Sequence, residues 1–204
     1  MESDRRFRSL ILATENENKV REFSALLGGR LKIISLKEKS SSFSLPPEGE
    51  NSYEENARQK AFTVGTALHS DALGDDSGFE VEALGLRPGV VSARYGAEGP
   101  RKLAAHEQRA LILRELAQVR ERRARFVSVL SFYDLRRQRT VEFRGEVYGT
   151  VALTERGEGG FGYDSLFVPD SYLKTFAEMD EAQKNAISHR AVALKLFLQW
   201  LDKT

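Results

Sequence analysis

The sequence predicts a mixed α/β fold, and three observations carry that prediction. Residues 9–36 read as a strand, a helix and a second strand. Residues 124–134 and 140–153 are expected to be two long strands of one hairpin, joined near 136–139. The apolar residues of the last helix step by four and three along 187–201. Strands interleaved with helices in this way favour a sheet that is flanked by helices.

The opening β-α-β unit is built from short, clear signals. SLILAT (9–14) is expected to be a buried strand, and LKIISL (31–36) is expected to be a second one. The helix between them has apolar residues at helical spacing and stops at two glycines; these positions are Val20, Phe23, Leu27, Gly28 and Gly29. Such units are usually parallel and right-handed, so both strands should lie in one parallel sheet.

The next segments are a loop, a helix and a strand. Residues 37–52 are rich in Ser, Pro and Glu and are expected to form a mobile loop. Ser52 and Glu55 have the spacing of a capping box, so a helix should open at Tyr53. Its apolar face consists of Ala57, Ala61, Val64 and Leu68. A strand near 72–74 should run into the sequence DDSG.

Residues 101–119 are expected to be helical, and the long hairpin after them is a candidate for a second lobe. Two interpretations of the last helix stay open. In a continuous helix, His189 points away from the apolar stripe. A break with Ser188 as a new N-cap instead places His189 and Arg190 in a first turn.

The composition is that of a globular protein, which we expect to form a single domain over residues 1–204. The absence of cysteine excludes disulfides and thiolate chemistry, and three histidines make a His-rich zinc site unfavourable. The formal net charge of +1 argues against a nucleic-acid partner, and the one basic run, VRERRARF, fits a helix C-terminus. With no long apolar run and no signal peptide, we expect no membrane partner and a cytoplasmic location.

TENENK (14–19) lies where a strand hands over to a helix. Helix starts expose N–H groups that bind phosphate. Thr14 and Asn16 add short polar side chains, and Lys19 adds a charge. The alternative is an ordinary βα turn that Asn16 caps.

Two further motifs suit phosphate and metal. Asp75 and Asp76 are adjacent carboxylates that repel each other, which a metal ion or a proton relieves. Carboxylate oxygens suit Mg²⁺. The alternative is an Asp-rich surface turn, which is common. Asn56 and Lys60 lie on one helix face, which faces either a polyphosphate or solvent.

The stretch GEGGFGYDSLFVPD (157–170) contains four glycines within its first six residues. Because glycine has no side chain, a ligand can approach the main chain there. Phe161 and Tyr163 either stack on a flat ring or anchor this loop to the core, and Asp164 can accept a hydrogen bond. KNAISHR (184–190) gathers Lys, His and Arg; its alternative is a charged helix face.

Five segments in order resemble the inosine triphosphate pyrophosphatase family, over nearly the whole chain: LATENENKVREF, YEENARQKA, GDDSGFEVEALGLRPGVVSARYG, GGFGYDSLFVPD and KTFAEMDEAQKNAISHRAVAL. The resemblance implies a long mixed twisted sheet flanked by helices, with two lobes around a central cleft. It also implies Mg²⁺ dependence, a homodimer, and hydrolysis of non-standard purine nucleoside triphosphates (ITP, dITP and XTP) to a monophosphate and pyrophosphate.

The resemblance further implies roles for single residues. Asp76 matches a magnesium ligand and proposed general base. The matching substrate contacts are Thr14, Asn16, Lys19, Lys60, Ser77, Phe161, Gly162, Tyr163, Asp164, Lys184, His189 and Arg190. Two positions depart from the family pattern. Glu48 is the candidate second metal ligand, but its segment is offset by about one residue, and Glu15 replaces a usual glycine and must point away from phosphate or be paired.

Three other functions remain open from the sequence. A septum-formation-type pyrophosphatase, acting on modified pyrimidine nucleotides, would need a different base pocket in place of FGYD and SHR. A non-catalytic nucleotide-binding regulator would keep the pocket without turnover. A nucleic-acid-binding module conflicts with the near-neutral charge.

Overall fold

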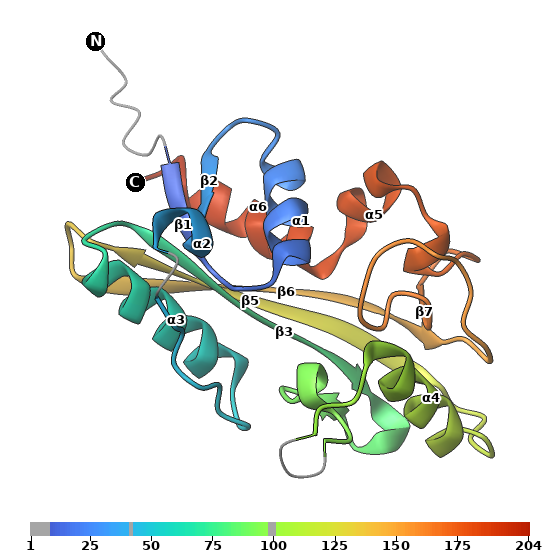
Figure 1. Ribbon diagram of the computed structural model, residues 1–204. Coiled ribbons are helices and arrows are strands. Elements are labelled where there is room, and N and C mark those ends of the chain that lie inside the picture. The colour runs from blue at the N-terminus through green and yellow to red at the C-terminus, as the bar shows by residue number, and fades with distance from the viewer. Residues whose placement is uncertain (1–8, 41–42, 98–100) are drawn as a thin grey trace. The chain divides into compact units, whose positions relative to one another are not determined.

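The computed structural model describes residues 9–40, 43–97 and 101–204, and its strands form one mixed seven-stranded sheet (Figure 1). The strands are Ser9–Ala13 (β1), Lys32–Ser35 (β2), Ala72–Val81 (β3), Arg87–Gly89 (β4), Arg123–Asp134 (β5), Arg139–Val151 (β6) and Phe167–Pro169 (β7). Their order is β2-β1-β3-β5-β6-β7, with β4 paired to β3. β1 is parallel to β2 and β3, whereas β4 and β7 run antiparallel to β3 and β6. The predicted α/β class with a mixed sheet is confirmed.

The helices are Glu17–Leu27 (α1), Leu36–Lys39 (α2), Tyr53–Ala67 (α3), Ala105–Glu115 (α4), Glu181–Ile187 (α5) and His189–Leu201 (α6). Three 3₁₀ turns, Glu82–Leu84, Ser92–Arg94 and Phe176–Glu178, complete the regular structure of the described ranges. None of the helices within those ranges combines the length and the apolar character that crossing a membrane requires.

The chain divides into two compact units. The first comprises the described residues within 9–76, 129–144 and 193–204, and the second comprises the described residues within 77–128 and 145–192. The long hairpin of β5 and β6 therefore contributes to both units, and the prediction that it forms a second lobe by itself was wrong. The single domain over 1–204 and its cleft stay predictions.

The core of the first unit follows from the alternation of side chains along β1. Leu10 and Leu12 face one side, where they pack with Phe23 of α1 and Phe197 of α6. Ile11 and Ala13 face the other side and pack with α2 and α3. In Figure 1, α1 and α6 accordingly lie on the opposite side of β1 from α3. The predicted ends of α1 are also confirmed, because Asn16 caps its start and Gly28 ends it in the left-handed conformation.

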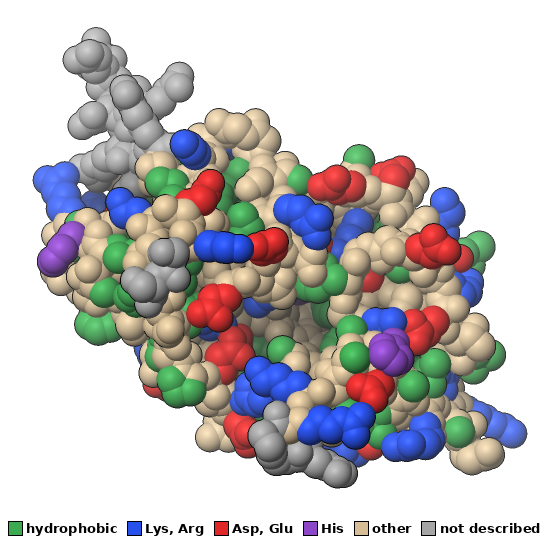
Figure 2. All heavy atoms as spheres, viewed as in Figure 1, with side chains coloured by type: hydrophobic (Ala, Val, Ile, Leu, Met, Phe, Trp, Pro, Cys, Tyr) green, Lys and Arg blue, Asp and Glu red, His purple; other side chains and the backbone are tan. Residues whose placement is uncertain are grey.

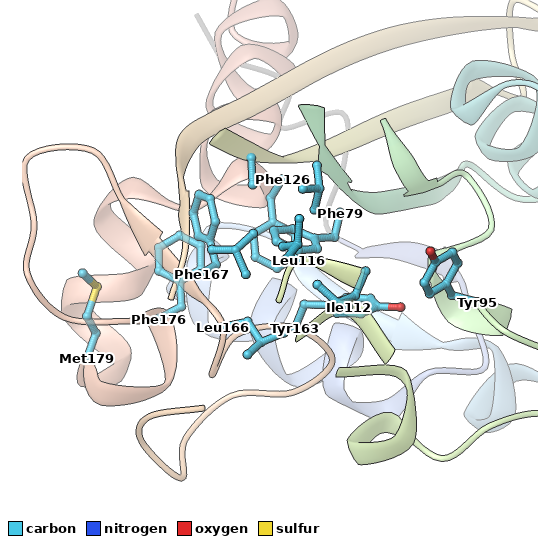
Figure 3. Close-up of a cluster of buried hydrophobic side chains, with 13 residues drawn as sticks. Phe79, Tyr95, Ile112, Leu116, Phe126, Tyr163, Leu166, Phe167, Phe176 and Met179 are labelled. Carbon is cyan, nitrogen blue, oxygen red and sulfur yellow. The ribbon is translucent and has the colours of Figure 1, made fainter. Parts of the chain in front are cut away.

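The core of the second unit is aromatic. Phe79, Phe126, Phe167 and Phe176 pack through stacked, tilted and edge-to-face contacts with ring centroids 4.9–5.9 Å apart. Figure 3 shows these rings beside Ile112 and Leu116, at the end of α4. The buried Arg122 of the basic run donates to the carbonyl of Leu116 (2.8 Å) and to those of Val151 and Ala152 (both 2.9 Å). One arginine of that run thus serves a helix C-terminus, as expected.

Four local predictions need correction. DDSG is no turn after a strand, because β3 continues through Asp75 and Asp76 to Val81. The predicted loop 37–52 begins with the last residues of α2, a helix whose start is capped by a capping box of Ser35 and Glu38. Residues 41–42 of this loop lie outside the described residues. The helix expected over 101–119 is shorter, Ala105–Glu115.

The fourth correction concerns the helix at Tyr53, where only half of the predicted capping box forms. Glu55 donates its N–H to Ser52 Oγ (3.1 Å), but its carboxylate pairs with Arg58 (3.2 Å).

At Ser188, the helix break is the correct alternative, because Ser188 is extended (φ −65°, ψ 155°) and Ala191 N–H donates to its Oγ (3.2 Å). On the face drawn in Figure 2, positive and negative side chains are interspersed, in keeping with the net charge of +1.

Candidate active site

Gly74 allows α3 to lie directly against β3. A Cβ atom at this position would come within 2.1 Å of the Ala57 carbonyl oxygen and 2.9 Å of the Ala61 nitrogen. Both atoms belong to the α3 backbone, which cannot move aside cheaply. Because Lys60 lies on this stretch of α3, the close approach brings its side chain to the part of β3 that holds Asp75 and Asp76.

The Lys60 ammonium holds three oxygens at once. Its Nζ lies 2.9 Å from Asp76 Oδ1, 2.7 Å from Glu48 Oε1 and 2.8 Å from the Asp75 carbonyl. The ammonium has three N–H donors, so these three acceptors satisfy it. Lys60 and Asp76 are 4% and 3% exposed. The interpretation of this helix face as solvated was therefore wrong.

Asn56, one turn before Lys60, completes the cluster. Its Nδ2 donates to Asp76 Oδ2 (3.0 Å) and to the Gly49 carbonyl (3.2 Å), and its Oδ1 accepts from Gly49 N–H (2.8 Å). Asn56 thereby ties the backbone next to Glu48 to the carboxylate of Asp76. The segment that carries Glu48 is fixed against α3 by these bonds.

Burial and charge act in opposite directions on this pair. Burial lowers the pKa of Lys60, but the carboxylates of Asp76 and Glu48 outweigh it, and the pKa is raised above its ordinary value. Burial raises the pKa of Asp76, and the ammonium groups of Lys60 and Lys19 offset only part of that rise. Asp76 is thus more basic than an ordinary aspartate, which suits a group that accepts a proton.

The β1–α1 turn supplies a second ammonium. Lys19 Nζ lies 2.6 Å from Asp75 Oδ2, and the Asp75 side chain is fully buried. Asn16 Oδ1 accepts from the N–H groups of Asn18 (2.9 Å) and Lys19 (3.4 Å), so the capping role considered for Asn16 is confirmed. The buried Thr14 accepts the Asn16 N–H at its Oγ1 (3.2 Å).

Glu15, the departure from the family pattern, is exposed. Its Oε1 lies 3.5 Å from the backbone nitrogen of Leu45. This contact turns the carboxylate toward the segment after residue 42. Glu15 is thus paired, one of the two outcomes expected for a carboxylate beside a phosphate site.

Glu48 and Asp76 suit a divalent cation by their chemistry. No group of three or more His, Cys, Asp or Glu side chains is arranged for a metal within the described ranges. However, both carboxylates contact the same ammonium nitrogen, so both reach one small positive charge. Hard carboxylate oxygens are the ligands that Mg²⁺ takes, and it completes its shell with water and phosphate oxygens.

The Gly-rich loop is shaped by its own chain at two of its glycines. A Cβ atom at Gly157 would lie 2.4 Å from the Ala177 carbonyl carbon, and one at Gly160 would lie 2.1 Å from Asp164 Oδ2. Gly162 differs, because a Cβ atom there would meet nothing within 4 Å. Ligand approach is therefore not the only reason for the glycines of this loop.

The aromatic residues of the loop divide into two roles. Tyr163 anchors the loop, since its ring stacks on Phe79 at 5.2 Å and its hydroxyl donates to the Ser92 carbonyl (2.8 Å). Figure 3 shows Tyr163 within the buried cluster. The Phe161 ring is only half-buried, and Lys184 Nζ and Arg190 Cζ lie 5.3 and 5.2 Å from its centroid. Tyr163 therefore serves the core, whereas the Phe161 ring contacts two cationic side chains.

Asp164 and the SHR segment surround Phe161. Asp164 Oδ2 accepts from Phe161 N–H (2.8 Å) and from Lys184 Nζ (2.7 Å). Arg190 Nη2 donates to Ser77 Oγ (2.8 Å). The break at Ser188 turns His189 inward, where its ring stacks on Phe126 with centroids 4.7 Å apart.

The predicted site residues fall into two groups, one in each unit. The first unit holds Thr14, Asn16, Lys19, Glu48, Lys60 and Asp76, and the second holds Ser77, Phe161, Gly162, Tyr163, Asp164, Lys184, His189 and Arg190. In the first group, contacts join Thr14, Asn16 and Lys19 to one another and, separately, Lys60 to Asp76 and Glu48. In the second group, contacts join five residues, which are Ser77, Phe161, Asp164, Lys184 and Arg190. The remaining three contact residues that were not predicted: Gly162 contacts Arg109, Tyr163 contacts Phe79, and His189 contacts Phe126. Sequence reasoning missed Arg109, which bonds to the Gly162 carbonyl (2.9 Å) from a helix 53 residues earlier. No local pattern marks it.

Comparisons with known proteins agree with this geometry. The model of the Ham1 family matches residues 10–200. A protein of Gluconobacter oxydans named dITP/XTP pyrophosphatase is 43% identical over 93% of this chain and 88% of its own length. One of the same name from Deinococcus radiodurans is 43% identical over 95% and 93%.

Solved structures are also similar. The Ham1 protein of Staphylococcus aureus has a TM-score of 0.82 and 33% identity, over 96% of this chain and 98% of its own. The nucleoside-triphosphatase / dITP/XTP pyrophosphatase of Mycobacterium abscessus has a TM-score of 0.72 and 33% identity, over 93% and 98%.

Proposed function

The chain belongs to the Ham1 family, and from that premise we propose that it hydrolyses the non-standard purine nucleoside triphosphates ITP, dITP and XTP. Water attacks the α-phosphorus, the bond to the α–β bridging oxygen breaks, and the products are a nucleoside monophosphate and pyrophosphate. The relatives named dITP/XTP pyrophosphatase support this reaction. The observation that carries it in this chain is the buried cluster of Lys60 with Asp76 and Glu48.

The first-unit residues are assigned to the triphosphate. Lys19 and Lys60 supply positive charge, and the free N–H groups at the start of α1 supply hydrogen-bond donors, with Thr14 and Asn16 holding that turn. Because the triphosphate carries several negative charges, these groups lower the barrier chiefly by neutralising it.

Asp76 is the general base of this proposal. It accepts a proton from the attacking water at one of its carboxylate oxygens, and Asn56 and Lys60 hold the carboxylate in place. No covalent enzyme intermediate is needed, since water itself attacks the phosphorus.

Mg²⁺ is the cofactor of this proposal, with Asp76 and Glu48 as its protein ligands. When bound, it would neutralise phosphate charge and help to orient the triphosphate. The carboxylates are suited to it because they already share one cation, the Lys60 ammonium.

The second-unit residues are assigned to the nucleoside. Phe161 offers a ring face, and Lys184, His189 and Arg190 offer donors. Inosine and xanthosine carry an oxygen at purine position 6, where adenosine carries an amino group. A donor such as the Arg190 guanidinium satisfies the oxygen and opposes the amino group. Ser77, which accepts a hydrogen bond from Arg190, holds it in position.

Two further parts of the proposal concern the state of the protein. We infer a homodimer from the family resemblance, and light scattering at micromolar concentration tests it: a monomer mass contradicts this part alone. We also infer a cytoplasmic location, which fits an enzyme that removes non-standard nucleotides from the nucleotide pool. The chain contains no cysteine and so does not depend on disulfides, which is compatible with that location.

Product analysis tests the reaction. The purified protein is incubated with ITP and Mg²⁺, and the products are separated by anion exchange. We expect IMP and pyrophosphate in equal amounts, and no turnover in excess chelator. Release of IDP and orthophosphate, or undiminished turnover with chelator, would contradict the proposal. No turnover of any nucleotide despite tight binding would instead indicate a nucleotide-binding regulator.

A further inference from the structure

The Gly-rich loop is closed by contacts at its base. The Arg156 N–H donates to the Ser165 carbonyl (3.0 Å), which brings the two ends of the segment between them together. The Ser165 hydroxyl also donates to Glu155 Oε2 (3.1 Å). The loop is therefore a compact unit whose ends are held beside each other by backbone and side-chain bonds.

Arg109 of α4 binds this loop at two points. Its Nε donates to Glu155 Oε2 (2.6 Å), where the two ends of the loop meet. Its Nη1 donates to the carbonyl of Gly162 (2.9 Å), which lies between the aromatic residues Phe161 and Tyr163. The Arg109 side chain is 18% exposed. A guanidinium is planar and its N–H groups point in fixed directions, so two bonds from one group fix the distance between base and motif.

Gly162 is the flexible position that this bond restrains. Its neighbour Tyr163 is fixed in the core, as described above, and Phe161 carries the half-buried ring. Gly162 has φ +63° and open space where a side chain would be. A glycine in such surroundings meets little steric resistance to reorientation of its peptide groups. Asp164 holds the Phe161 main chain, because its Oδ2 accepts the Phe161 N–H (2.8 Å) and its own N–H donates to the Phe161 carbonyl (3.2 Å), and the Arg109 bond adds a restraint on the Gly162 carbonyl that follows.

We infer, resting on the proposed function, that Arg109 is a positioning residue for nucleoside binding. It orients the Gly162 peptide and thereby the Phe161 ring that receives the purine. Glu155 holds the guanidinium in the orientation that reaches Gly162, and Ser165 supports Glu155. Arg109 itself does not touch the reacting atoms, so its loss weakens binding of the base and leaves the chemical step largely intact.

Hydrogen exchange tests whether Arg109 restrains the loop, and it does so independently of activity. We call the two Arg109 bonds, to Glu155 and to Gly162, the clamp. Mass spectrometry compares the peptide spanning 157–164 in the wild type, Arg109→Met and Arg123→Met. Arg123 is a matched control, since it also pairs with a carboxylate in the second unit, and that carboxylate, Asp170 (2.7 Å), lies outside the peptide 157–164. We expect faster exchange of this peptide in Arg109→Met alone, with the core strands unchanged.

Kinetics test the consequence for binding. We expect Arg109→Met to raise KM for ITP by about tenfold with kcat within about threefold of wild type, the pattern of lost binding that does not touch the chemical step. Arg109→Lys keeps the charge but lacks the planar group with two N–H donors in fixed directions. Its KM for ITP should therefore lie between that of Arg109→Met and that of the wild type. Glu155→Gln keeps a hydrogen-bond acceptor for Arg109, so its KM for ITP should lie between that of Arg109→Lys and that of the wild type.

The outcomes separate this inference from the proposed function. If the wild type does not hydrolyse ITP, the proposed function fails, whereas the exchange result still reports on the clamp. If Arg109→Met folds and neither loop exchange nor KM changes, the inference is wrong. The inference is also wrong if hydrogen exchange becomes faster throughout the second unit, because Arg109 is then a general stabilising residue. If Arg109→Met does not fold, the same measurements on Arg109→Lys decide between these outcomes.

Discussion

The Nζ atom of Lys60 lies 2.9 Å from Oδ1 of Asp76, and both side chains are almost completely buried. An ion pair removed from water loses hydration on both partners, and such a pair seldom stabilises a fold more than apolar residues of the same size. Retaining it in the middle of β3 therefore suggests a chemical role.

Asp76→Asn should lower kcat by about a hundredfold or more, because it removes the proposed base and one metal ligand. Stability should fall by about 1–3 kcal/mol, because the buried Lys60 ammonium loses one carboxylate and keeps that of Glu48. Since burial raises the pKa of Asp76, the ionised carboxylate is less favourable in the folded chain than in the unfolded one at neutral pH. The amide removes that cost while it weakens the bond to Lys60.

The measurement is kcat for ITP together with chemical denaturation of both proteins. Asp134→Asn, which alters a carboxylate at the tip of the β5–β6 hairpin in the same unit, serves as the control and should keep its kcat. Near-normal kcat in a folded Asp76→Asn protein would reassign the base, with Asp75 as the next candidate.

Gly74→Ala should destabilise the first unit by about 3 kcal/mol or more, since its methyl group would overlap the α3 backbone. Any folded fraction should also lose activity, because α3 must move and carries Lys60 with it. Gly28→Ala is the control: it adds a methyl in open space at a left-handed position and should cost about 1 kcal/mol without loss of activity. Equal stability of the two variants by urea denaturation would show that α3 does not lie against Gly74.

Arg190→Ala should erode the preference for ITP over ATP by raising KM for ITP more than KM for ATP. The reason is that a buried guanidinium donates and never accepts, so it discriminates between an oxygen and an amino group at position 6. The measurement is kcat/KM for both nucleotides in both proteins. If both values fall together with their ratio unchanged, Arg190 serves the phosphates or the fold, and another residue reads the base.

Asp134 should contribute a pH-dependent part of the stability. Burial raises the pKa of this carboxyl, but hydrogen bonds from the side chain (2.7 Å) and N–H (3.0 Å) of Arg137 outweigh it, and the pKa is lowered. A lowered carboxyl pKa stabilises the fold above the pKa of the unfolded state, and this contribution disappears as the pH falls through the folded pKa.

The difference in unfolding free energy between wild type and Asp134→Asn should therefore be about 1–3 kcal/mol near pH 7. It should shrink as the pH falls below about 4, the ordinary aspartate range. Denaturation at several pH values measures it. A difference that stays constant down to pH 2 would mean that the charge of Asp134 does not matter.

Local signals account for what the sequence predicted correctly. Asn16 and Gly28 bound α1 as expected, because capping depends on neighbouring backbone groups that the sequence itself supplies. The Ser188 break was one of two open alternatives, since apolar spacing at 187–201 fits both a continuous helix and a broken one. Resemblance to a family resolved what spacing did not, namely which of several polar motifs belong together.

Tertiary contacts account for the rest. Asp75, Asp76 and Gly74 have low strand propensity, so a surface turn stood as an alternative for DDSG. The ammonium groups of the buried Lys60 and the partly buried Lys19, with the backbone of α3, hold this segment in β3. The burial of Lys60 depends on the same approach of α3. Arg109 is 46 residues from Glu155 in the chain, so no periodicity or motif indicates their bond.

The release of pyrophosphate from ITP, measured beside that from ATP in the wild type and in Asp76→Asn, tests the central claim most directly. With Mg²⁺ present, we predict a kcat/KM for ITP at least about a hundredfold above that for ATP, the scale that an unpaired buried donor supports. Asp76→Asn should abolish most of the ITP turnover. Equal kcat/KM for the two nucleotides, or full activity in Asp76→Asn, would contradict the account.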